Sequence, residues 1–276
     1  RWLQVASAKS PISIATYIKE SNLQLIETNV PNLLKPDILI AGCGTGQQAI
    51  EAAFNFLHGE ILAIDLSLSS LSYAKRKTEE LGLKSIEYIQ ADILNLKKLD
   101  RRFDVIECAG TLHHMKNPMA GWKILTECLK PGGMLMIGLY SEMARQHILS
   151  VRNEISQRGV NSTPLEMIAF RNELIRSKEA HHKKLFLTPD FYSLSELRDL
   201  LFHAEEHRFT ISKIQECLNE LGLKFCGFPN RFIRERFKSE FTEPDAVYNL
   251  EQWNEFEHRN PNTFFGMYEF WCQKVE

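Results

Sequence analysis

The sequence lacks the features that typify membrane proteins, secreted disulfide scaffolds and nucleic-acid-binding proteins. No apolar run in its 276 residues approaches the length that crosses a bilayer, and no secretory signal pattern is present. The six cysteines form no Cys-x-x-Cys pair and mostly lie inside apolar runs, so we expect reduced, buried thiols. A net charge of -2 gives no electrostatic reason for a nucleic-acid partner. We therefore expect a cytoplasmic protein with neither a nucleic-acid nor a membrane partner.

The remaining composition is that of an ordinary globular protein. Hydrophobic residues make up 44% of the chain and charged residues 25%. The length suits one large α/β domain, or a domain with a sizeable insertion. The chain begins at Arg1 rather than at a methionine, which suggests a piece of a longer protein.

The most informative stretch is an apolar segment that runs into a glycine-rich turn, Asp37 to Gln47. Residues 38–40 form a continuous apolar run, as expected of a parallel strand buried on both faces. Apolar residues then recur at helical spacing from Ile50 to Leu57, with Gly59 placed to end the helix. Glycines let the backbone turn sharply and approach a ligand closely, and the N–H groups at a helix start favour polar or anionic groups. The turn therefore predicts a nucleoside-cofactor site.

The glycine spacing narrows the choice of cofactor. Gly42, Gly44 and Gly46 follow a Gly-x-Gly-x-Gly pattern, and Gln47 stands where the dinucleotide fingerprint places its last glycine. This departure disfavours a nicotinamide or flavin dinucleotide.

Further strands alternate with helices after this turn. We expect strands at 61–64, 86–91, 103–108 and 134–139, and Asp65 and Asp92 directly follow two of them. Alternation of this kind predicts a parallel, doubly wound sheet whose ligands bind beyond the carboxyl ends of the strands. The glycine turn, both aspartates and Ala109 would meet at this rim. Asp65 lies about where such folds place the carboxylate that binds ribose hydroxyls.

Several motifs resemble those of one enzyme family. The segment Ile40-Ala-Gly-Cys-Gly-Thr-Gly46 resembles the first motif of class I S-adenosylmethionine-dependent methyltransferases. The Phe103-Asp-Val-Ile strand with its following Leu112-His-His, and Leu129-Lys-Pro-Gly-Gly before an apolar strand, are similar to later features of that family. The resemblance covers residues 37–139 firmly and 209–274 more loosely. Residues 190–209 also resemble methyltransferase domains that follow tetratricopeptide repeats in some bacterial proteins.

The resemblance implies a fold, a cofactor and a set of binding residues. The fold would be a Rossmann-like sheet of seven mostly parallel strands, with an antiparallel seventh strand added at the edge. Residues Gly42, Cys43, Gly44, Thr45 and Gly46 would hold the methionine end of S-adenosylmethionine, whose demethylated product is S-adenosylhomocysteine. Asp65, with Leu66 beside it, would hold the ribose, and Asp92 with Ile93 the adenine. Ala109 would lie under the methionine part.

The chain divides into four parts on this reading. Residues 1–36 form a lead-in with one helix around 12–26, and residues 37–140 form the cofactor-binding core. Residues 141–208 contain three polar helical segments, at about 142–156, 164–178 and 193–206, which we interpret as a lid that caps a substrate pocket. Residues 209–276 complete the sheet with a helix at 209–221, strands at 223–228 and 263–272, and a polar insertion at 229–261.

The expected chemistry is an in-line displacement that moves a methyl group to a small or medium-sized acceptor. Such a reaction mainly needs alignment and exclusion of water, so no particular catalytic residue type is required. If the acceptor is a hydroxyl or an ammonium, His113 or His114 is the candidate general base. Two alternatives remain open, a peptide or protein acceptor and a non-catalytic binding module.

Other histidines and tyrosines are candidates for contact with the substrate. His203 and His207 stand at i, i+4 on the last lid helix, and we interpret them as substrate contacts rather than zinc ligands because no third ligand is evident. Tyr140, at the end of the fifth strand, and Tyr268, in the last strand, are candidates to face the pocket. The basic run His181-His-Lys-Lys184 is interpreted as a solvated loop. No metal site is expected.

Overall fold

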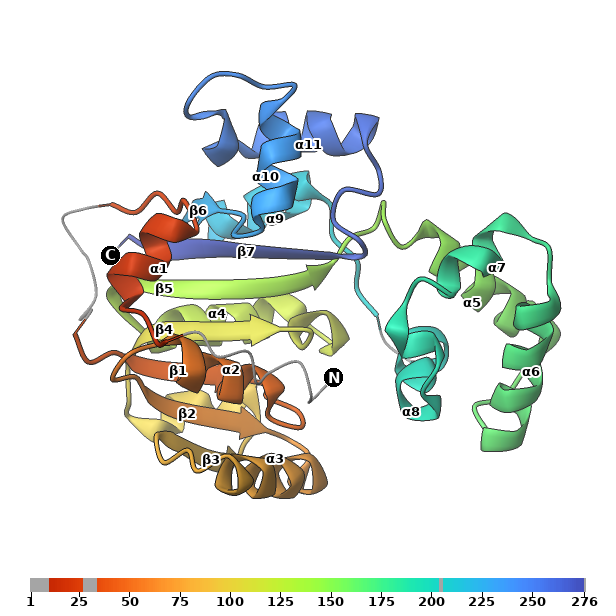
Figure 1. The fold of residues 1–276 in the computed structure, drawn as a ribbon, viewed down its shortest axis with the longest axis horizontal. Coiled ribbons are helices and arrows are strands. Elements are labelled where there is room, and N and C mark those ends of the chain that lie inside the picture. The colour runs from red at the N-terminus through yellow and green to blue at the C-terminus, as the bar shows by residue number, and fades with distance from the viewer. Residues whose placement is uncertain (1–9, 27–33, 204–205, 276) are drawn as a thin grey trace.

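The computed structural model describes residues 10–26, 34–203 and 206–275, which build an α/β domain with a helical lobe beside it (Figure 1). The strands are β1 Asp37–Ala41, β2 Glu60–Asp65, β3 Ile86–Gln90, β4 Phe103–Ala109, β5 Leu129–Tyr140, β6 Leu223–Gly227 and β7 Met267–Lys274. They form one seven-stranded sheet in the order β3-β2-β1-β4-β5-β7-β6. The predicted doubly wound, mostly parallel sheet is confirmed.

The last strand occupies a different place from the one expected. β7 runs antiparallel to both β5 and β6, as predicted, but it lies between them, so β6 is the edge strand. It begins at Met267 rather than at Thr263, because residues 261–266 form a turn. The apolar residues of β7 suit this position, since helices cover both faces of the sheet there.

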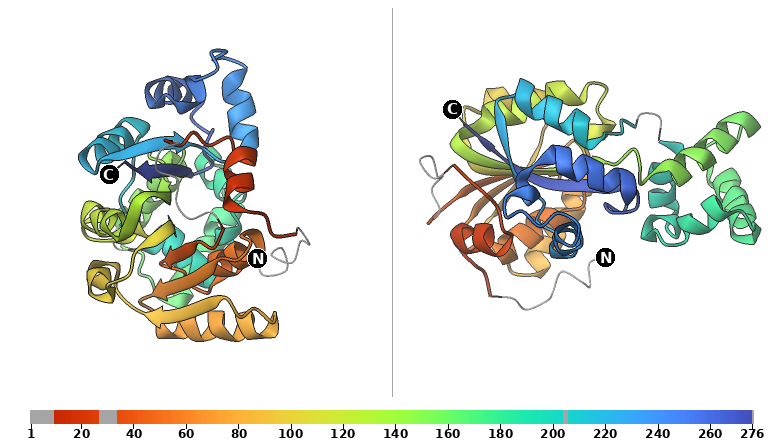
Figure 2. Two further views of the ribbon diagram at one scale, coloured as in Figure 1. Left: turned by 90° about the vertical axis from the view of Figure 1, so that its left-hand side faces the viewer. Right: turned by 90° about the horizontal axis from the view of Figure 1, so that it is seen from above.

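Helices cover both faces of the sheet (Figure 2). One face carries α1 Ile14–Glu20, α2 Gln47–Asn55 and α3 Leu68–Glu80. The other carries α4 Pro118–Cys128, α9 Ile211–Glu220, α10 Arg231–Lys238 and α11 Leu250–Arg259, together with the short helices η3 Ile93–Leu99, η4 Leu112–His114 and η7 Ala246–Tyr248. Because successive strand residues point to opposite faces, each strand contributes to both hydrophobic clusters.

Three predicted boundaries in this domain need correction. α2 ends at Asn55, and Phe56 turns into an extended, buried position where it pairs with Ile12, so Leu57 is left 41% exposed. The first helix spans only Ile14–Glu20 and stops before Asn22, whose φ is 52°. Residues 27–33, part of the lead-in, lie outside the described residues. Residues 130–133 lie within β5, where its register against β4 shifts, rather than in a turn before it.

The polar insertion at 229–261 is helical and carries an aromatic cluster. Asn230 caps α10 by accepting from the N–H groups of Phe232 and Ile233, and Asn249 caps α11 in the same way. Phe237 stacks on Trp253 with ring centroids 3.9 Å apart, and both side chains are fully buried. The sequence analysis described this insertion only as polar, although Leu250, Trp253 and Phe256 recur at the three-residue spacing of a helix face.

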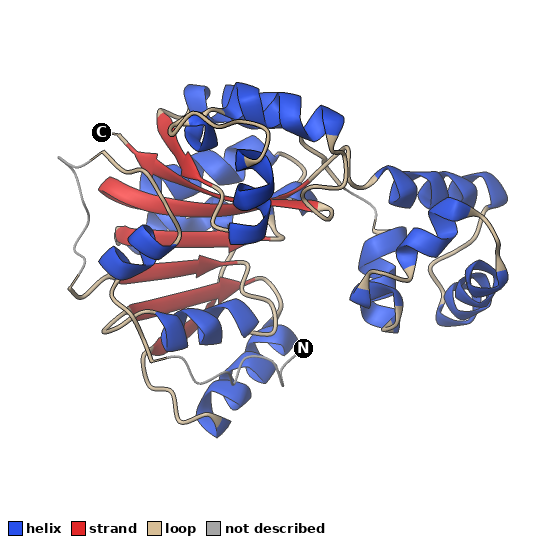
Figure 3. Ribbon diagram, turned by 45° about the horizontal axis from the view of Figure 1, so that its top comes forward, coloured by secondary structure: helices blue, strands red, loops and turns tan. Residues whose placement is uncertain are grey.

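The helical lobe is formed by residues 146–202 and contains no strand (Figure 3). Its elements are α5 Gln146–Arg158, α6 Pro164–Arg176, α7 Ala180–Leu185, η5 Pro189–Phe191, α8 Leu194–Leu197 and the π-helical turn η6 Arg198–Phe202. They enclose a separate hydrophobic cluster that includes Val151, Phe170, Leu185 and Phe191. Figure 1 shows this lobe standing beyond the carboxyl ends of the strands.

Two predictions within the lobe are wrong. The run His181 to Lys184 is part of α7 rather than a solvated loop, and His182 is buried with its ring nitrogens bonded to Ser177 and Glu154. The last helical segment ends at Phe202, so His203 and His207 do not share a helical face. The predicted state of the six cysteines is confirmed, because all are free and buried.

Candidate functional site

The glycine turn after β1 is held against the end of β2. The N–H groups of Gly42 and Cys43 both donate to the carbonyl of Ile64, at 2.9 Å each. Gly42 has φ +77°, and a Cβ there would overlap the side chain of Thr111. Gly44 also has a positive φ, of +51°, but no atom lies within 4 Å of its Cβ position. Position 42 thus requires glycine because of its positive φ and because there is no room for a Cβ. Position 44 requires glycine because of its positive φ alone.

Asp65 links this turn to the start of the next helix. Its Oδ2 accepts from the N–H of Gly44 and its Oδ1 from the N–H of Ser67, at 2.8 Å each. Since a carboxylate oxygen accepts more than one hydrogen bond, both oxygens keep capacity for ligand hydroxyls. The carboxylate is half-buried at the carboxyl end of β2, where the sequence predicted it.

A small cavity of about 110 Å³ opens beside Asp65. The residues that line it are Gly42, Asp65, Leu66, Ala91, Asp92, Ile93, Thr111 and Met115. Asp92 caps η3 by accepting from the N–H of Leu94 at 2.9 Å through Oδ1. Ile93 is buried, whereas Leu66 is 68% exposed. The lining of this cavity therefore includes an apolar side chain that is open to solvent.

Five of the predicted cofactor residues therefore line one cavity. Sequence reasoning did not list Ala91, which follows β3, or Thr111 and Met115, which flank η4 after β4. The Thr-Leu-His motif after Ala109 offered a signal for Thr111. Met115 ends the same loop, directly after η4.

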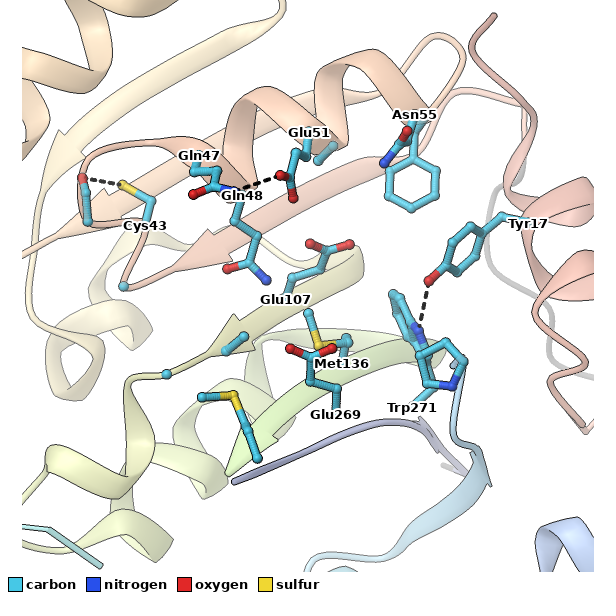
Figure 4. Close-up of a pocket in the computed structure, with 18 of the residues that line it drawn as sticks. Tyr17, Cys43, Gln47, Gln48, Glu51, Asn55, Glu107, Met136, Glu269 and Trp271 are labelled. Carbon is cyan, nitrogen blue, oxygen red and sulfur yellow. Dashed lines mark hydrogen bonds between the residues drawn. The ribbon is translucent and has the colours of Figure 1, made fainter. Parts of the chain in front are cut away.

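A larger cavity of about 550 Å³ lies on the α1 and α2 face of the sheet (Figure 4). At the rim it is lined by Gly42, Cys43, Gly44, Thr45, Ala109 and Gly110. Glu51, Glu107, Met136 and Glu269 line it further in, with Tyr17, Phe56 and Trp271 among the aromatic residues. Gly42 belongs to both cavities, so they meet at the glycine turn. Gly46 lines neither and is buried.

Sequence reasoning missed the carboxylates of this cavity. Glu107 is only 8% exposed, and burial, with Glu51 and Glu269 nearby, raises its pKa to about 8. Glu269 faces open space in the cavity, yet partial burial and the charge of Glu51 still raise its pKa. The available signal was Glu107 itself, in the middle of a buried strand whose other residues, apart from Asp104, are apolar, because buried acids are rarely left without a role.

Four predicted catalytic or substrate residues gather in a second group near the rim. The ring of His113 stacks on Tyr140 with centroids 3.7 Å apart, and the ring of His114 lies 4.2 Å from that of His203. His113 is fully buried, and neither ring nitrogen has a hydrogen-bond partner among the described residues. Desolvation, with His114 and Arg145 nearby, lowers the pKa of His113 to about 2. This histidine is therefore neutral at physiological pH, while His114 is half-buried.

His207 and Tyr268, the other two predicted substrate or pocket residues, do not place their rings in this group. His207 meets this group only through its backbone N–H, which donates to the carbonyl of His113 at 2.8 Å. The interpretation of Tyr268 as a pocket residue is wrong. Its ring is fully buried on the opposite face of the sheet, where its hydroxyl bonds to Glu257 at 2.7 Å.

The helical lobe joins the sheet through a neck formed by residues 140–145 and 206–209. The N–H of Phe209 donates to the carbonyl of Tyr140, and that of Glu142 to the carbonyl of Phe209. Glu206, with its side chain 1% exposed, bonds to Arg145 at 2.8 Å and Arg152 at 2.9 Å. Arg208 lies 3.3 Å from the same carboxylate, and Arg145 also covers the ring of Tyr140 at 3.6 Å. The neck thus places three cations around one buried acid.

One group of possible metal ligands lies within the lobe. Ligand atoms of Glu154, His181 and His182 come within 4.8 Å of one another. Both histidines already bond to Glu154, at 2.6 and 2.9 Å, and these bonds hold α7 against α5. None of the helices built from the described residues is both long and apolar enough to cross a membrane.

Comparison with known proteins identifies the family. Residues 35–186, more than half of the chain, match the model of a methyltransferase domain. An uncharacterized protein of Synechococcus sp., syc1184_c, is 29% identical over 237 residues, which cover 82% of this chain and 57% of that protein. The ubiquinone biosynthesis O-methyltransferase of Rickettsia canadensis is 29% identical over 129 residues, 47% of this chain and 53% of that one.

A solved structure shares the fold over almost the whole chain. PKMT2 from Rickettsia typhi, in complex with AdoHcy, superposes with a TM-score of 0.65 at 14% identity and covers 98% of this chain and 55% of that one. The chain therefore spans little more than half the length of these three proteins. The matched domain model, the sheet order and the glycine turn agree, and the chain belongs to the class I S-adenosylmethionine-dependent methyltransferases.

Proposed function

We propose that this protein transfers a methyl group from S-adenosylmethionine to a small or medium-sized acceptor by in-line displacement. The observation that carries the proposal is the meeting of two cavities at Gly42. The smaller one would hold part of the adenosine, and the larger one the methionine end at its rim and the acceptor further in, with the reacting atoms at their junction. Placing both reactants on one rigid turn supplies the alignment that such a displacement needs.

Each part of the cofactor would have its own residues. Asp65 would accept from the ribose hydroxyls, with Leu66 beside it, and Asp92 would accept from the adenine amino group next to Ile93. The turn of Gly42, Cys43, Gly44, Thr45 and Gly46 would hold the methionine end, with Ala109 beneath it. In this arrangement Gly46 acts indirectly, because it is buried and shapes the turn without lining a cavity.

The chain's own residues would align the acceptor, exclude water and receive a proton where the acceptor releases one. Bound S-adenosylmethionine supplies a methyl group on a sulfonium, which makes it electrophilic. Between the two candidate bases, burial favours His114, because His113 has no exposed surface and its pKa is lowered to about 2. His113 would instead position Tyr140 and His114 through ring contacts of 3.7 and 4.4 Å.

The helical lobe would act as the lid of the acceptor site. Tyr140 and His203 lie at its junction with the sheet, beside His114, and would contact the acceptor when the lobe approaches the rim. His207 would contribute through the neck. A cytoplasmic location remains a prediction, supported by six free, buried thiols.

Calorimetry and methyl transfer together test this function. We expect S-adenosylmethionine and S-adenosylhomocysteine to bind the protein, and radiolabel from the methyl group to appear in the low-molecular-weight fraction of a cell extract. The absence of cofactor binding would contradict the proposal. Cofactor binding without label transfer to any fraction would favour a non-catalytic binding module.

One observation favours a second candidate, an acceptor that is part of a peptide or protein. The helices of the lobe pack on one another, and none of the described lobe residues lines the larger cavity. A side chain of a macromolecule could enter an uncovered cavity of this kind. Label in the protein fraction, rather than among small molecules, would support this candidate.

A further inference from the structure

The larger cavity combines acidic and aromatic side chains, and no basic one is found among its described lining residues. Among the described residues, its lining includes three carboxylates, Glu51, Glu107 and Glu269, but no lysine, arginine or histidine. None of these carboxylates forms a salt bridge within the described part of the chain. In Figure 4, Glu107 and Glu269 stand in the middle of the cavity, with Tyr17 and Trp271 towards one end.

The register of the sheet explains how this lining is assembled. Glu107 of β4 pairs with Met136 of β5, which pairs with Trp271 of β7. One step nearer the rim, Ala109 pairs with Gly138, and Gly138 with Glu269. Because alternate residues share a face, both rows point into the same cavity. The acids thus lie between the aromatic end and the glycine turn.

The charged form of Glu107 is costly as long as no cation lies beside it. Glu107 is more than nine-tenths buried, and the amide of Gln48 bonds to it without supplying a charge. An ionised carboxylate in such a place is disfavoured unless a cation pairs with it. A cationic ligand would relieve both the desolvation and the mutual repulsion of the three acids.

The aromatic residues suit the same kind of ligand. The ring of Tyr17 lies 5.2 Å from that of Phe56 and 5.7 Å from that of Trp271, both edge-on. The indole N–H of Trp271 donates to the hydroxyl of Tyr17, which fixes both rings. Ring faces attract ammonium groups, and pockets lined by several rings bind quaternary ammonium ligands. A volume of about 550 Å³ is enough for a small organic molecule.

We propose that this cavity binds a positively charged ammonium group of the methyl acceptor, held by Glu107 and Glu269 and packed against Trp271. The inference rests on the proposed function and defines the chemical class of its substrate. The ammonium could belong to a free small amine or to a lysine side chain of a protein. Where its own nitrogen is the atom that is methylated, the ammonium first gives a proton to Glu107 or Glu269, because the displacement needs a lone pair on that nitrogen.

Binding of a charged probe and its neutral isostere tests the inference. Choline and 3,3-dimethyl-1-butanol have the same shape, and only choline is charged. Each is titrated by calorimetry into protein saturated with S-adenosylhomocysteine. We expect choline to bind about tenfold more tightly than the neutral alcohol, with Glu107→Gln and Trp271→Leu each removing most of that difference. Equal affinities, or no choline binding, would overturn the proposal.

Controls separate this inference from the function on which it rests. Glu79→Gln removes an exposed acid on α3 outside both cavities and should leave choline binding unchanged. Binding of S-adenosylhomocysteine is verified first, and its absence would count against the proposed function. If S-adenosylhomocysteine binds and choline does not, the result counts against the inference alone. If Glu107→Gln weakens binding of S-adenosylhomocysteine instead of choline, the acid serves the cofactor and the inference is wrong. Thermal melting verifies that each variant is folded.

A second experiment separates the two sources of the ammonium. Labelled methyl groups are transferred to a cell extract, and the products are hydrolysed and separated. Label in methylated small amines, or in methylated lysine from the protein fraction, supports the inference and identifies the source. Label in phenol ethers or carboxylate esters that carry no ammonium group would contradict it.

Discussion

Asp65 carries the strongest single-residue prediction for cofactor binding. Replacement by alanine removes a carboxylate that already organises the turn through Gly44 and Ser67. We expect Asp65→Ala to weaken S-adenosylmethionine binding by about 1 to 3 kcal/mol, and Asp65→Asn by less, because the amide still offers one acceptor oxygen. Calorimetric titration measures both, and equal affinities for the wild type and both variants would contradict the assignment.

The two glycines of the turn should respond differently to the same substitution. Gly44→Ala introduces only an unfavourable backbone conformation, which costs about 1 to 2 kcal/mol. Gly42→Ala adds an overlap with Thr111 at the junction of the two cavities, so we expect about 1 to 3 kcal/mol more, together with a larger loss of cofactor binding. Urea unfolding compares the two variants. A Gly44→Ala variant that is less stable than Gly42→Ala would count against this geometry.

Glu107 should make the stability of the protein depend on pH. Burial raises its pKa from 4.5 to about 8, so between these values the folded state holds a proton that the unfolded state has lost. Its contribution to the free energy of unfolding therefore falls as pH rises through this window, by up to about 1.4 kcal/mol per pH unit. Glu107→Gln should flatten this dependence, whereas Glu79→Gln should not. Urea unfolding at several pH values tests this, and equal slopes for the wild type and Glu107→Gln would contradict it.

Residues at the rim were easier to predict than residues in the cavity. Asp65 and Asp92 directly follow strands, and the topology of an alternating fold alone places them at one edge. Glu107 and Trp271 meet through the register of three strands, and Tyr17 arrives on a helix far away in the sequence. A glutamate in a buried strand marks Glu107, but no local pattern contains the register that brings it to Trp271 and Tyr17, so the cavity could not be predicted from the sequence.

At the scale of elements, the neck between sheet and lobe is the most sensitive connection. Glu206 neutralises part of the charge of Arg145, Arg152 and Arg208, and its side chain is almost fully buried. We expect Glu206→Gln to destabilise the fold by about 3 kcal/mol, because it leaves buried cations without a counter-charge. Glu173→Gln, which breaks an exposed pair with Arg158 in the same lobe, should cost less than about 1 kcal/mol. Urea unfolding of both variants checks this, and similar losses would contradict the role given to the neck.

Helices and strands were predicted more reliably than their ends. Apolar runs located the core strands, and helical segments were expected where the structure has α6 and α9, which each bury one apolar face. The helix ends that were predicted wrongly are determined by tertiary contacts. Phe56 leaves α2 to pair with Ile12, and the chain after Phe202 leaves the lobe to form the neck.

At the scale of the whole molecule, the sheet and the lobe are two separately packed units joined by the neck. The lobe has its own hydrophobic cluster, while both sheet clusters are closed by helices of the α/β domain (Figure 1). The sequence indicated this division, because residues 141–208 contain no strand pattern. It gave no signal that the lobe would stand beyond the rim rather than against it.

A crystal structure with S-adenosylhomocysteine would test the central claim most directly. The account predicts adenine beside Asp92 and Ile93, ribose hydroxyls on Asp65, and the thioether sulfur at Gly42 facing the cavity of Glu107 and Trp271. Binding of the product elsewhere on the chain, or an adenosine seated away from Asp65, would contradict it.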